Sequence, residues 1–439
     1  MAWPMALRAV MMFSIVIIDL YLVSSLGDEA VAAIGIATVI AGLLMGTTFA
    51  FANATQVKVA QAFGTENPAA LNTAFVCGLI INSILVLCGI GLILIFGDSA
   101  IQAMAHTQTI AEGAAEYLHI FLLVMVVEAL SAVLTSFFNG CGRTRLAFYS
   151  FLISAPVNIV SSVVLIFGLY GFPELGLQGA AWGSFLGAAL RLLYLTGQYA
   201  AFQSTQSQHL ESQRQSWQVK GLVYATVRHF KFSCPIAVTF VSMTFANQAC
   251  MAIYANMSVY HFAAMTLIMP WVRIAGQLSY TWTQATGILV AQMLGKSLES
   301  DQLDEFLSRA WRSAFIAAMV VAVIYALIVF STAWIYSDLS NETRTALFSF
   351  LPILLVLPFP RVSNAICGNV LRASGDSKSS MNIHLIANWM FMVPITALCV
   401  LVFQLPVAWV FALFLIEELV KFPMFHRRIW SKQWHSLAP

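Results

Sequence analysis

The sequence predicts an all-α membrane protein with twelve transmembrane helices. Its 439 residues are 60% hydrophobic and only 9% charged, whereas soluble domains carry about 25% charged residues, so most of the surface cannot face water. Apolar runs also recur between polar breaks at the length of about 20 residues that a helix needs to cross a bilayer. The net charge of +2 does not indicate nucleic-acid binding. No metalloprotease or serine-hydrolase motif occurs in the runs, so no enzyme activity is expected.

The apolar runs fall into two sets of six. The first set lies near 5–26, 34–60, 73–96, 114–137, 148–170 and 177–201. The second set lies near 231–256, 262–293, 311–335, 345–370, 382–403 and 405–426. A polar, low-complexity stretch over 203–218 separates the sets and indicates a linker. We therefore expect the following division: an N-lobe over 1–202, a cytoplasmic linker over 203–228, a C-lobe over 229–426 and a cytoplasmic tail over 427–439.

Basic residues concentrate in alternate connections between the expected helices. One set of connections, to which the tail belongs, holds nearly all of the basic residues outside the spans. In the opposite set Arg344 is the sole basic residue. The positive-inside rule assigns the basic set to the cytoplasm. The protein is therefore expected in a bacterial inner membrane with both termini in the cytoplasm, and an even number of spans follows.

The two halves repeat one another in sequence. Residues 59–64 (VAQAFG) match residues 290–295 (VAQMLG), 231 positions later, and the same offset relates Pro4 to Pro235. Further on, residues 142–145 (GRTR) match 375–378 (GDSK). Because six spans per half preserve orientation, the repeat is parallel, with a pseudo-two-fold axis along the membrane normal. Two such bundles around a midplane site are a common transporter architecture.

Asp19 is the most informative residue. It lies inside an apolar run, and no basic residue occurs between Arg8 and Lys58. A carboxylate at the centre of a bilayer costs several kcal/mol unless it is protonated, paired or solvated. Because burial disfavours the charged form, we hypothesise that Asp19 takes up and releases a proton. The alternative is a carboxylate that one hydroxyl or amide holds permanently and that never titrates.

Four features, in order and spacing, resemble the multidrug and toxic compound extrusion (MATE) family, and most of all its DinF-like bacterial branch. They are Pro4 with an aspartate fifteen residues later, the VAQ-x-x-G ending of the second helix, the loop over 142–144, and Pro156-Val157-Asn158 together with 176–181. The resemblance covers nearly the whole chain. It implies twelve helices in two V-arranged lobes and the cation- or proton-driven export of drugs and toxic organic compounds by alternating access.

The resemblance also implies roles for three residues. Asp19 would be the proton-binding carboxylate, Asn158 its polar neighbour on the fifth helix, and Pro4 the place where the first helix bends. Position alone makes Pro4 an ordinary first-turn residue, and Asn158 could equally form an ordinary interhelical hydrogen bond.

Two departures from the family favour a proton over sodium. The sodium-coupled branch carries an acid on the seventh helix, eight residues after its proline, where this chain has Met243, and residues 175–195 contain no acid. We therefore predict a proton-coupled antiporter, with a sodium-coupled exporter as the alternative. A lipid-linked precursor flippase of the same superfamily is less consistent with the sequence, because the first six spans offer Arg191 and little other basic charge.

Further polar residues are candidates for lining an aqueous cavity. These are Asn53, Thr55 and Gln56 on the second helix, Gln178 on the sixth and Gln284 on the eighth. A polar stripe on the second helix recurs on the eighth, which favours the cavity, although the hydroxyls of both stripes could instead bond to carbonyls of their own helix. The two stripes are Thr47, Thr48, Asn53, Thr55 and Gln56, and Ser279, Thr281, Thr283, Gln284 and Thr286. Six other charges fall within the expected spans and are expected to be structural, with the first two forming a pair: Glu128, Arg191, Arg273, Arg361, Glu417 and Glu418.

The expected partners follow from this assignment. They are small organic drugs of cationic character, protons or else sodium, and the lipid bilayer. The protein is expected to be a monomer without a cofactor or bound metal, and its seven scattered cysteines are expected to serve packing.

Overall fold

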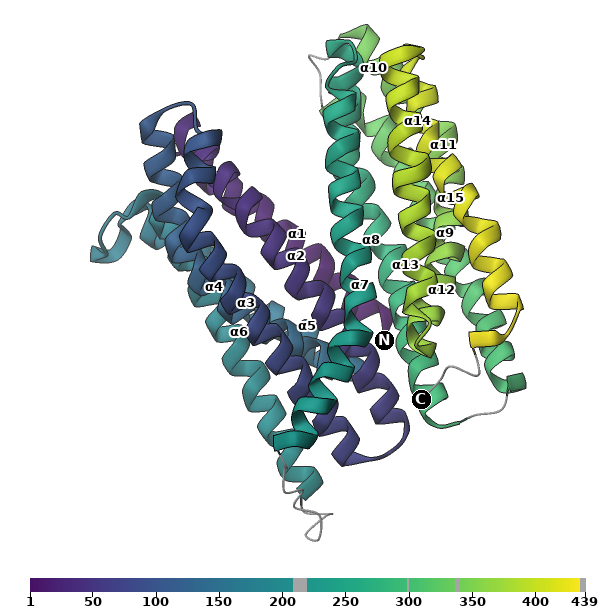
Figure 1. Ribbon diagram of the computed structural model, residues 1–439. Coiled ribbons are helices and arrows are strands. Elements are labelled where there is room, and N and C mark those ends of the chain that lie inside the picture. Colours follow the sequence, from purple (N-terminus) through teal and green to yellow (C-terminus); the bar gives the residue numbers. More distant parts are fainter. Residues whose placement is uncertain (208–218, 298–299, 336–339, 435–439) are drawn as a thin grey trace. The chain divides into compact units, whose positions relative to one another are not determined.

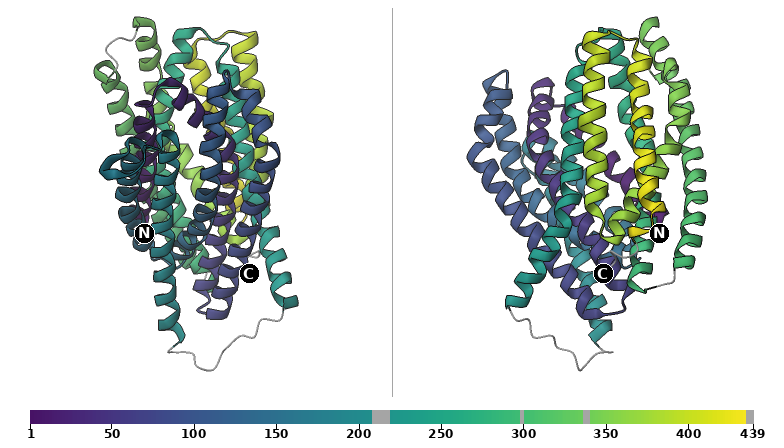
Figure 2. Two further views of the ribbon diagram at one scale, coloured as in Figure 1. Left: turned by 90° about the vertical axis from the view of Figure 1, so that its left-hand side faces the viewer. Right: turned by 45° about the vertical axis from the view of Figure 1, so that its right-hand side comes forward.

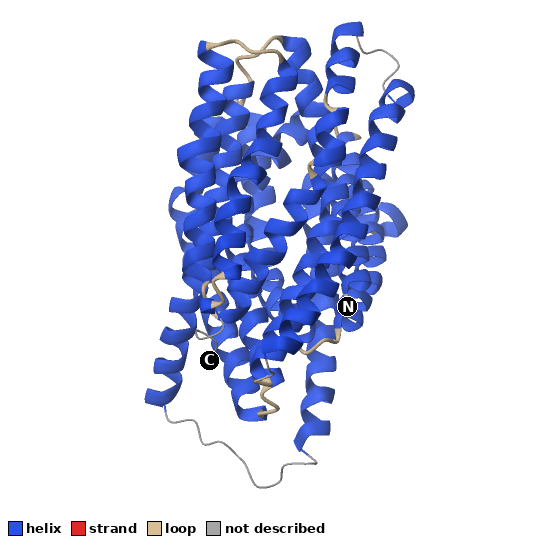
Figure 3. Cartoon of the chain, turned by 90° about the vertical axis from the view of Figure 1, so that its right-hand side faces the viewer, coloured by secondary structure: helices blue, strands red, loops and turns tan. Residues whose placement is uncertain are grey.

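The described part of the chain is helical throughout, as Figure 3 shows. The computed structural model describes residues 1–207, 219–297, 300–335 and 340–434. Helices and short loops account for all of these residues, so the predicted fold class is confirmed. The predicted tail begins inside a helix that continues to Trp430, and its last residues, 435–439, lie outside the described ranges.

Six long helices coincide with the first six predicted spans. Their bounds are α1 Ala2–Ser24, α2 Asp28–Gly64, α3 Pro68–Met104, α4 Gln108–Gly140, α5 Thr144–Phe167 and α6 Gly176–Ser207. A short 3₁₀ helix, η1 (Leu169–Gly171), separates α5 from α6. Within this set α2, α3 and α4 pack side by side and α5 packs along α6, whereas α1 has no comparably extensive partner among the described helices (Figure 1).

The remaining spans are also helical, although two are interrupted. Their bounds are α7 Val219–Tyr254, α8 Val259–Gly295, α9 Ser300–Ile335, α10 Asn341–Ser349, α11 Leu351–Val356, α12 Pro358–Ser374, α13 Ser377–Leu385, η2 Ile386–Met392, α14 Val393–Ala397, η3 Leu398–Val402 and α15 Val407–Trp430. Figure 2 shows these helices from two further sides.

The interruptions have local causes. The predicted span over 345–370 is bent by 47° between Val356 and Pro358, where a proline ends the preceding helical hydrogen-bonding pattern. The span over 382–403 carries two π-helical stretches, η2 and η3, on either side of α14, which begins at Val393-Pro394. A proline removes one backbone donor, and a local π adjustment is one way in which a helix accommodates that loss.

Eight described helices are long and apolar enough to cross a membrane, or nine if the bent pair is one span. The other three helices, α6, α8 and α15, have 32, 37 and 24 residues. They are long enough to cross the hydrocarbon core and are less apolar because they carry more polar or charged side chains.

The chain divides into two compact units. The N-terminal unit extends to Ala237 and the C-terminal unit begins at Val238. This division lies inside α7 and differs from the predicted one at residue 229, because the start of α7 packs on α2: the rings of Phe230 and Phe51 stack with centroids 5.5 Å apart. The predicted linker over 203–228 is also partly helical, since α6 continues to Ser207 and α7 starts at Val219. The assignment of lobes stays a prediction.

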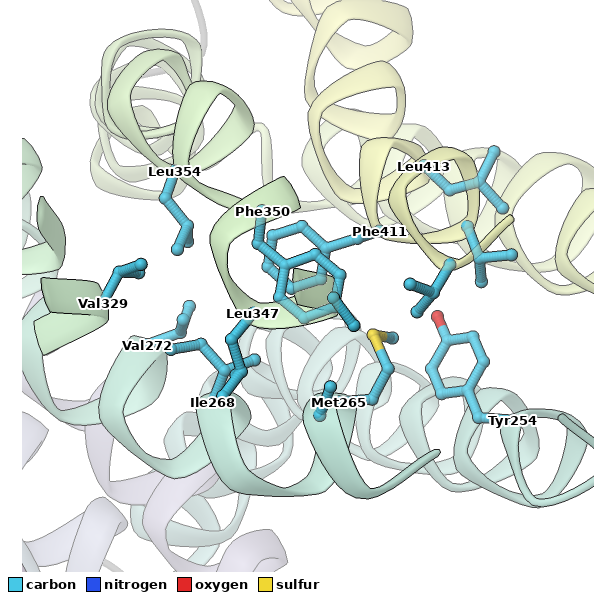
Figure 4. Packing of buried hydrophobic residues seen from close by; sticks show 14 of the residues in the cluster. Tyr254, Met265, Ile268, Val272, Val329, Leu347, Phe350, Leu354, Phe411 and Leu413 are labelled. Carbon is cyan, nitrogen blue, oxygen red and sulfur yellow. The ribbon is translucent and has the colours of Figure 1, made fainter. Parts of the chain in front are cut away.

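A large cluster of apolar side chains forms the core of the C-terminal unit (Figure 4). The rings of Phe350 and Phe411 stack with centroids 4.2 Å apart, joining the end of α10 to α15. Met265 and Ile268 of α8 fill the space beside them and are almost completely buried. The hydroxyl of Tyr325 donates to the carbonyl of Val272, 2.9 Å away, so even the polar atom of this large ring is satisfied.

In the N-terminal unit, a row of glycines lets α6 lie directly against α5. Gly179, Gly183 and Gly187 are spaced four residues apart, so they lie on one face of α6. A Cβ atom at Gly183 would lie 2.6 Å from the backbone nitrogen of Ser162. Small residues at this spacing allow close backbone approach between membrane helices.

We predict that Gly183→Ala lowers the apparent melting temperature of the purified protein. The added methyl group collides with the backbone of α5, and overpacking of this kind costs about 1–3 kcal/mol. Gly197→Ala on the same helix is the matched control, because a Cβ there meets nothing within 4 Å. That variant is expected to leave the melting temperature unchanged or slightly raised. Equal losses in the two variants would contradict the packing account.

Candidate functional site

Asp19 is a half-buried carboxylate on α1 that lacks a partner. Its Oδ1 atom is shielded from solvent and has no hydrogen-bond partner within the described ranges. No lysine or arginine of these ranges acts on it either. The described residues therefore do not compensate the cost that a carboxylate carries in a membrane helix.

Tyr117 is the residue that sequence reasoning missed beside this carboxylate. It is buried on α4, its ring stacks on Phe121, and it interacts electrostatically with Asp19. A phenol can both donate and accept a hydrogen bond, so Tyr117 is chemically suited to either protonation state of the carboxyl group. One tyrosine in a predicted span gives no signal in the sequence, because its position relative to α1 depends on how α4 packs.

Asn158 is buried on α5, in the same unit as Asp19. Its Nδ2 donates to the hydroxyl of Ser184 on α6 at 3.3 Å, while its Oδ1 is buried without a partner among the described residues. The ordinary interhelical hydrogen bond is thus present. A direct hydrogen bond to Asp19 is not formed in this conformation, and the expected role as its neighbour stays a prediction.

Pro4 lies in the first turn of α1, which begins at Ala2. The bend that the family resemblance implies at Pro4 is not seen in this conformation, and the role of Pro4 as a hinge stays a prediction.

Two of the predicted cavity residues are enclosed by protein. Thr55 is 1% exposed and its hydroxyl contacts Nε2 of His229 at 3.1 Å. Gln56 is 3% exposed and its Oε1 accepts a hydrogen bond of 3.1 Å from Asn139. Both side chains therefore hold helices together here and do not line a cavity in this conformation. The sequence could not show this, because His229 approaches from the start of α7.

The other predicted cavity residues lie in different surroundings. Asn53 and Gln284 occupy repeat-related positions on α2 and α8, and both are half-buried. Gln178 lies in the first turn of α6 and donates to Glu116 at 3.0 Å, so it joins the ends of two helices. Most hydroxyls of the two polar stripes bond to carbonyls of their own helix, as in the pair Thr286 and Trp282. The alternative interpretation of these hydroxyls therefore describes this conformation better than the cavity does.

The predicted pair of buried charges in the first half is confirmed. Glu128 on α4 and Arg191 on α6 form an ion pair. Arg191 also stacks on the ring of Phe151, whose centroid is 4.3 Å from its guanidinium carbon, and Arg8 approaches the same ring at 5.6 Å. Glu128 acts electrostatically on Arg8 as well. The two guanidinium groups thus lie near one aromatic ring of α5, and the cluster brings α1 next to the ion pair of α4 and α6.

The charges of the second half are mostly paired too. Glu418 on α15 lies 3.0 Å from Lys421 and 3.5 Å from Arg361 on α12, and its second oxygen accepts from Asn364 at 2.9 Å. Lys421 also pairs with Glu417 at 2.9 Å. These contacts show that the charges are paired, as the expected structural role requires, and the role itself stays a prediction.

Arg273 is the exception among the six charges, because it is exposed. Its neighbour Val272 points into the core, and consecutive residues of a helix lie about 100° apart around its axis. The expectation that Arg273 is buried was therefore wrong.

The family of the chain follows from comparison with known sequences. The MatE family model matches residues 4–164 and 235–398, which together make up most of the chain and fall one in each half of the predicted repeat. The chain belongs to the MatE family. Its members are transporters and not enzymes.

Individual relatives agree with this assignment. The MatE protein is 25% identical over 406 residues to a probable multidrug resistance protein, NorM, of Rhizobium meliloti, covering 88% of this chain and 82% of that protein. It is 22% identical over 385 residues to YoeA of Bacillus subtilis, also a probable multidrug resistance protein, with coverages of 84% and 79%.

Solved structures confirm the fold. The MatE protein superimposes on a mutant of the MATE transporter VcmN of Vibrio cholerae with a TM-score of 0.84, covering 99% of this chain and 96% of that one at 16% sequence identity. The predicted architecture of twelve transmembrane helices in two lobes is therefore that of a known transporter fold.

We predict that Glu128→Gln destabilises the protein more than Arg191→Gln does. Removing the carboxylate leaves Arg8 and Arg191 both uncompensated, whereas removing Arg191 leaves Arg8 with Glu128. Breaking a buried pair by removing one partner costs about 3–5 kcal/mol. Thermal unfolding of the purified variants measures which variant is less stable. The double variant Glu128→Gln/Arg191→Gln is expected to recover part of the stability that Glu128→Gln loses. The reverse order would show that Arg8 does not depend on Glu128.

Proposed function

We propose that this MatE protein is a proton-coupled antiporter that exports drugs and other toxic organic compounds by alternating access. The names of its relatives, which are probable multidrug resistance proteins, support small organic substrates, and the family fold supports transport. We infer a cationic character for the drugs, because each proton that enters would exchange for positive charge that leaves.

One observation supports Asp19 as the proton carrier. Among the charges that sequence analysis identified within the spans, Asp19 is the carboxylate without a cation beside it and with a shielded oxygen that lacks a partner. The other carboxylates, Glu128, Glu417 and Glu418, are each engaged by an arginine or lysine. A permanently paired carboxylate has little tendency to bind a proton, because the cation stabilises its charged form.

We infer that protonation acts on α1. Neutralising Asp19 would remove the penalty of a charge in an apolar surrounding and turn an acceptor into a donor. Asn158 and Tyr117 lie in the same unit, Tyr117 interacts electrostatically with Asp19, and we propose both as hydrogen-bond partners of the carboxyl group. Because α1 packs less extensively than the other helices of its unit, a change in these hydrogen bonds could alter its path at low cost and displace a bound drug.

The proposed function also includes a location and an orientation in the membrane. We infer a multi-pass protein of the bacterial inner membrane with both termini in the cytoplasm, because the basic residues gather in one set of connections. We also infer that a monomer is the working unit.

We predict that Asp19→Asn abolishes drug export while the protein remains in the membrane. The amide keeps the shape of the side chain but cannot carry a proton. Asp28→Asn is the matched control, because Asp28 is an exposed aspartate in the first turn of α2, and export is expected to be unchanged. The measurement is ethidium resistance of cells that produce equal amounts of each variant, and full resistance with Asp19→Asn would exclude the proposed role.

A second experiment identifies the coupling ion. Everted membrane vesicles are loaded with ethidium under an imposed pH gradient or, separately, under an imposed sodium gradient without a pH difference. We expect transport with the pH gradient alone, and its loss in Asp19→Asn vesicles. Transport driven by the sodium gradient would instead identify a sodium-coupled exporter and overturn the proton assignment.

A further inference from the structure

A pocket opens at the start of α1, beside the connection between α4 and α5. Its volume is about 550 Å³, and the residues that line it include Trp3, Pro4, Arg143, Thr144 and Arg145. We propose that this pocket binds the phosphate-bearing headgroup of an anionic phospholipid. The inference rests on the proposed orientation of the spans, which puts the connection between α4 and α5 at the membrane surface, and on charge, but not on the coupling ion.

The pocket carries positive charge that no described residue lining it neutralises. Arg143 and Arg145 are both exposed, and none of the described residues that line the pocket is acidic. The guanidinium carbon of Arg143 lies 4.8 Å from the ring centroid of Phe202 on α6. This stacking holds the side chain in place while its N–H groups remain available, and a planar guanidinium suits a phosphate group.

The turn that presents these arginines is rigid. Gly142 has φ +79°, and the N–H groups of Gly142 and Arg143 donate to the carbonyls of Asn139 and Phe138 at 3.0 and 2.8 Å. This is the hydrogen-bonding pattern of a Schellman ending, which satisfies the last carbonyls of α4. The positions of the arginine backbones are therefore fixed before any ligand arrives.

The repeat supplies an internal comparison for this turn. Gly375 in the C-terminal unit has φ +95°, and the residue after it is Asp376, where the first half has Arg143. Asp376 binds Arg428 of α15 at 2.7 Å, so the second turn is neutralised within the protein. At the equivalent place in the first half the residue is Arg143, whose charge is opposite to that of Asp376. Among the described residues, the aromatic ring of Phe202 packs on it, and no carboxylate pairs with it. An external anion would complete this site.

The pocket also has an apolar side suited to lipid. Trp3 is 66% exposed, and Pro4 and Leu146 line the wall beside it. Tryptophan is enriched at the level of lipid headgroups, where one part of the ring is apolar and the N–H is polar. A soluble phosphate would use only the arginines, whereas a phospholipid would use both sides, so we assign the pocket to a lipid.

Lipid binding here would reach the helix that carries Asp19. The hydroxyl of Thr144 donates to the carbonyl of Met1 at 3.2 Å, so the pocket wall is joined to the start of α1. A headgroup held between Trp3 and the arginines would fix this end of α1 to the membrane surface.

The test counts lipids bound to the delipidated, purified full chain by native mass spectrometry. Phosphatidylglycerol and phosphatidylcholine with the same acyl chains are titrated separately. We expect the wild type to bind one phosphatidylglycerol about tenfold more tightly than phosphatidylcholine, and Arg143→Gln/Arg145→Gln to reduce this preference to about twofold or less. Equal preference in the wild type and the double variant would overturn the proposal.

Two controls separate the site from general surface charge. Lys378→Gln removes one charge at the repeat equivalent of Arg145 and is expected to leave the preference unchanged, while Arg145→Gln alone is expected to reduce it. If the double variant unfolds, the comparison of Arg145→Gln with Lys378→Gln tests the proposal instead. An equal loss of phosphatidylglycerol preference in these two single variants would exclude a specific pocket. Complete displacement of bound phosphatidylglycerol by millimolar sn-glycerol 3-phosphate would show that the pocket recognises free phosphate and would overturn the lipid assignment.

Discussion

Charge inside a membrane helix requires compensation, and the described structure is organised around this requirement. Glu128 pairs with Arg191 in the first half, and Glu418 is surrounded by Lys421, Arg361 and an amide in the second. These clusters join helices that are distant in sequence, so charge compensation and helix packing are achieved by the same contacts. Asp19 has no such partner among the described residues, and this difference is the physical basis on which we propose it as the functional carboxylate.

The helices themselves could be predicted from the sequence because the bilayer imposes a length and a polarity on them. All twelve predicted spans coincide with helical segments. The breaks inside the tenth and eleventh spans were not predicted, since a proline is compatible with both a straight and a bent membrane helix until its neighbours are known. The start of α7 was assigned to the second half for a similar reason. Its packing on Phe51 and Thr55 depends on tertiary contacts that the linear sequence does not contain.

The candidate site was predictable only in part. Asp19 could be identified because the free-energy cost of a carboxylate in a membrane helix depends on the residue type and on the hydrophobicity of the neighbouring sequence alone. Thr55 and Gln56 could not be judged in this way, because a polar residue can face a cavity or another helix with the same sequence pattern. In this conformation both face other helices. Tyr117 was missed for the complementary reason: its relevance lies in its electrostatic interaction with Asp19, which depends on how α4 packs, and not in any feature of its own sequence surroundings.

The two halves share a repeat but differ in charge, and the differences fall on α1 and its surroundings. The position equivalent to Asp19, 231 residues later, is Cys250, which is buried and contacts the hydroxyl of Thr396 at 3.9 Å. The turn equivalent to the basic pocket is closed by Asp376 and its arginine partner. The second half thus has no charge at the first position and a paired charge at the second. Within the described ranges, the first half has a carboxylate and two arginines without such partners near one helix, and these are the groups that we propose take up a proton and an anion.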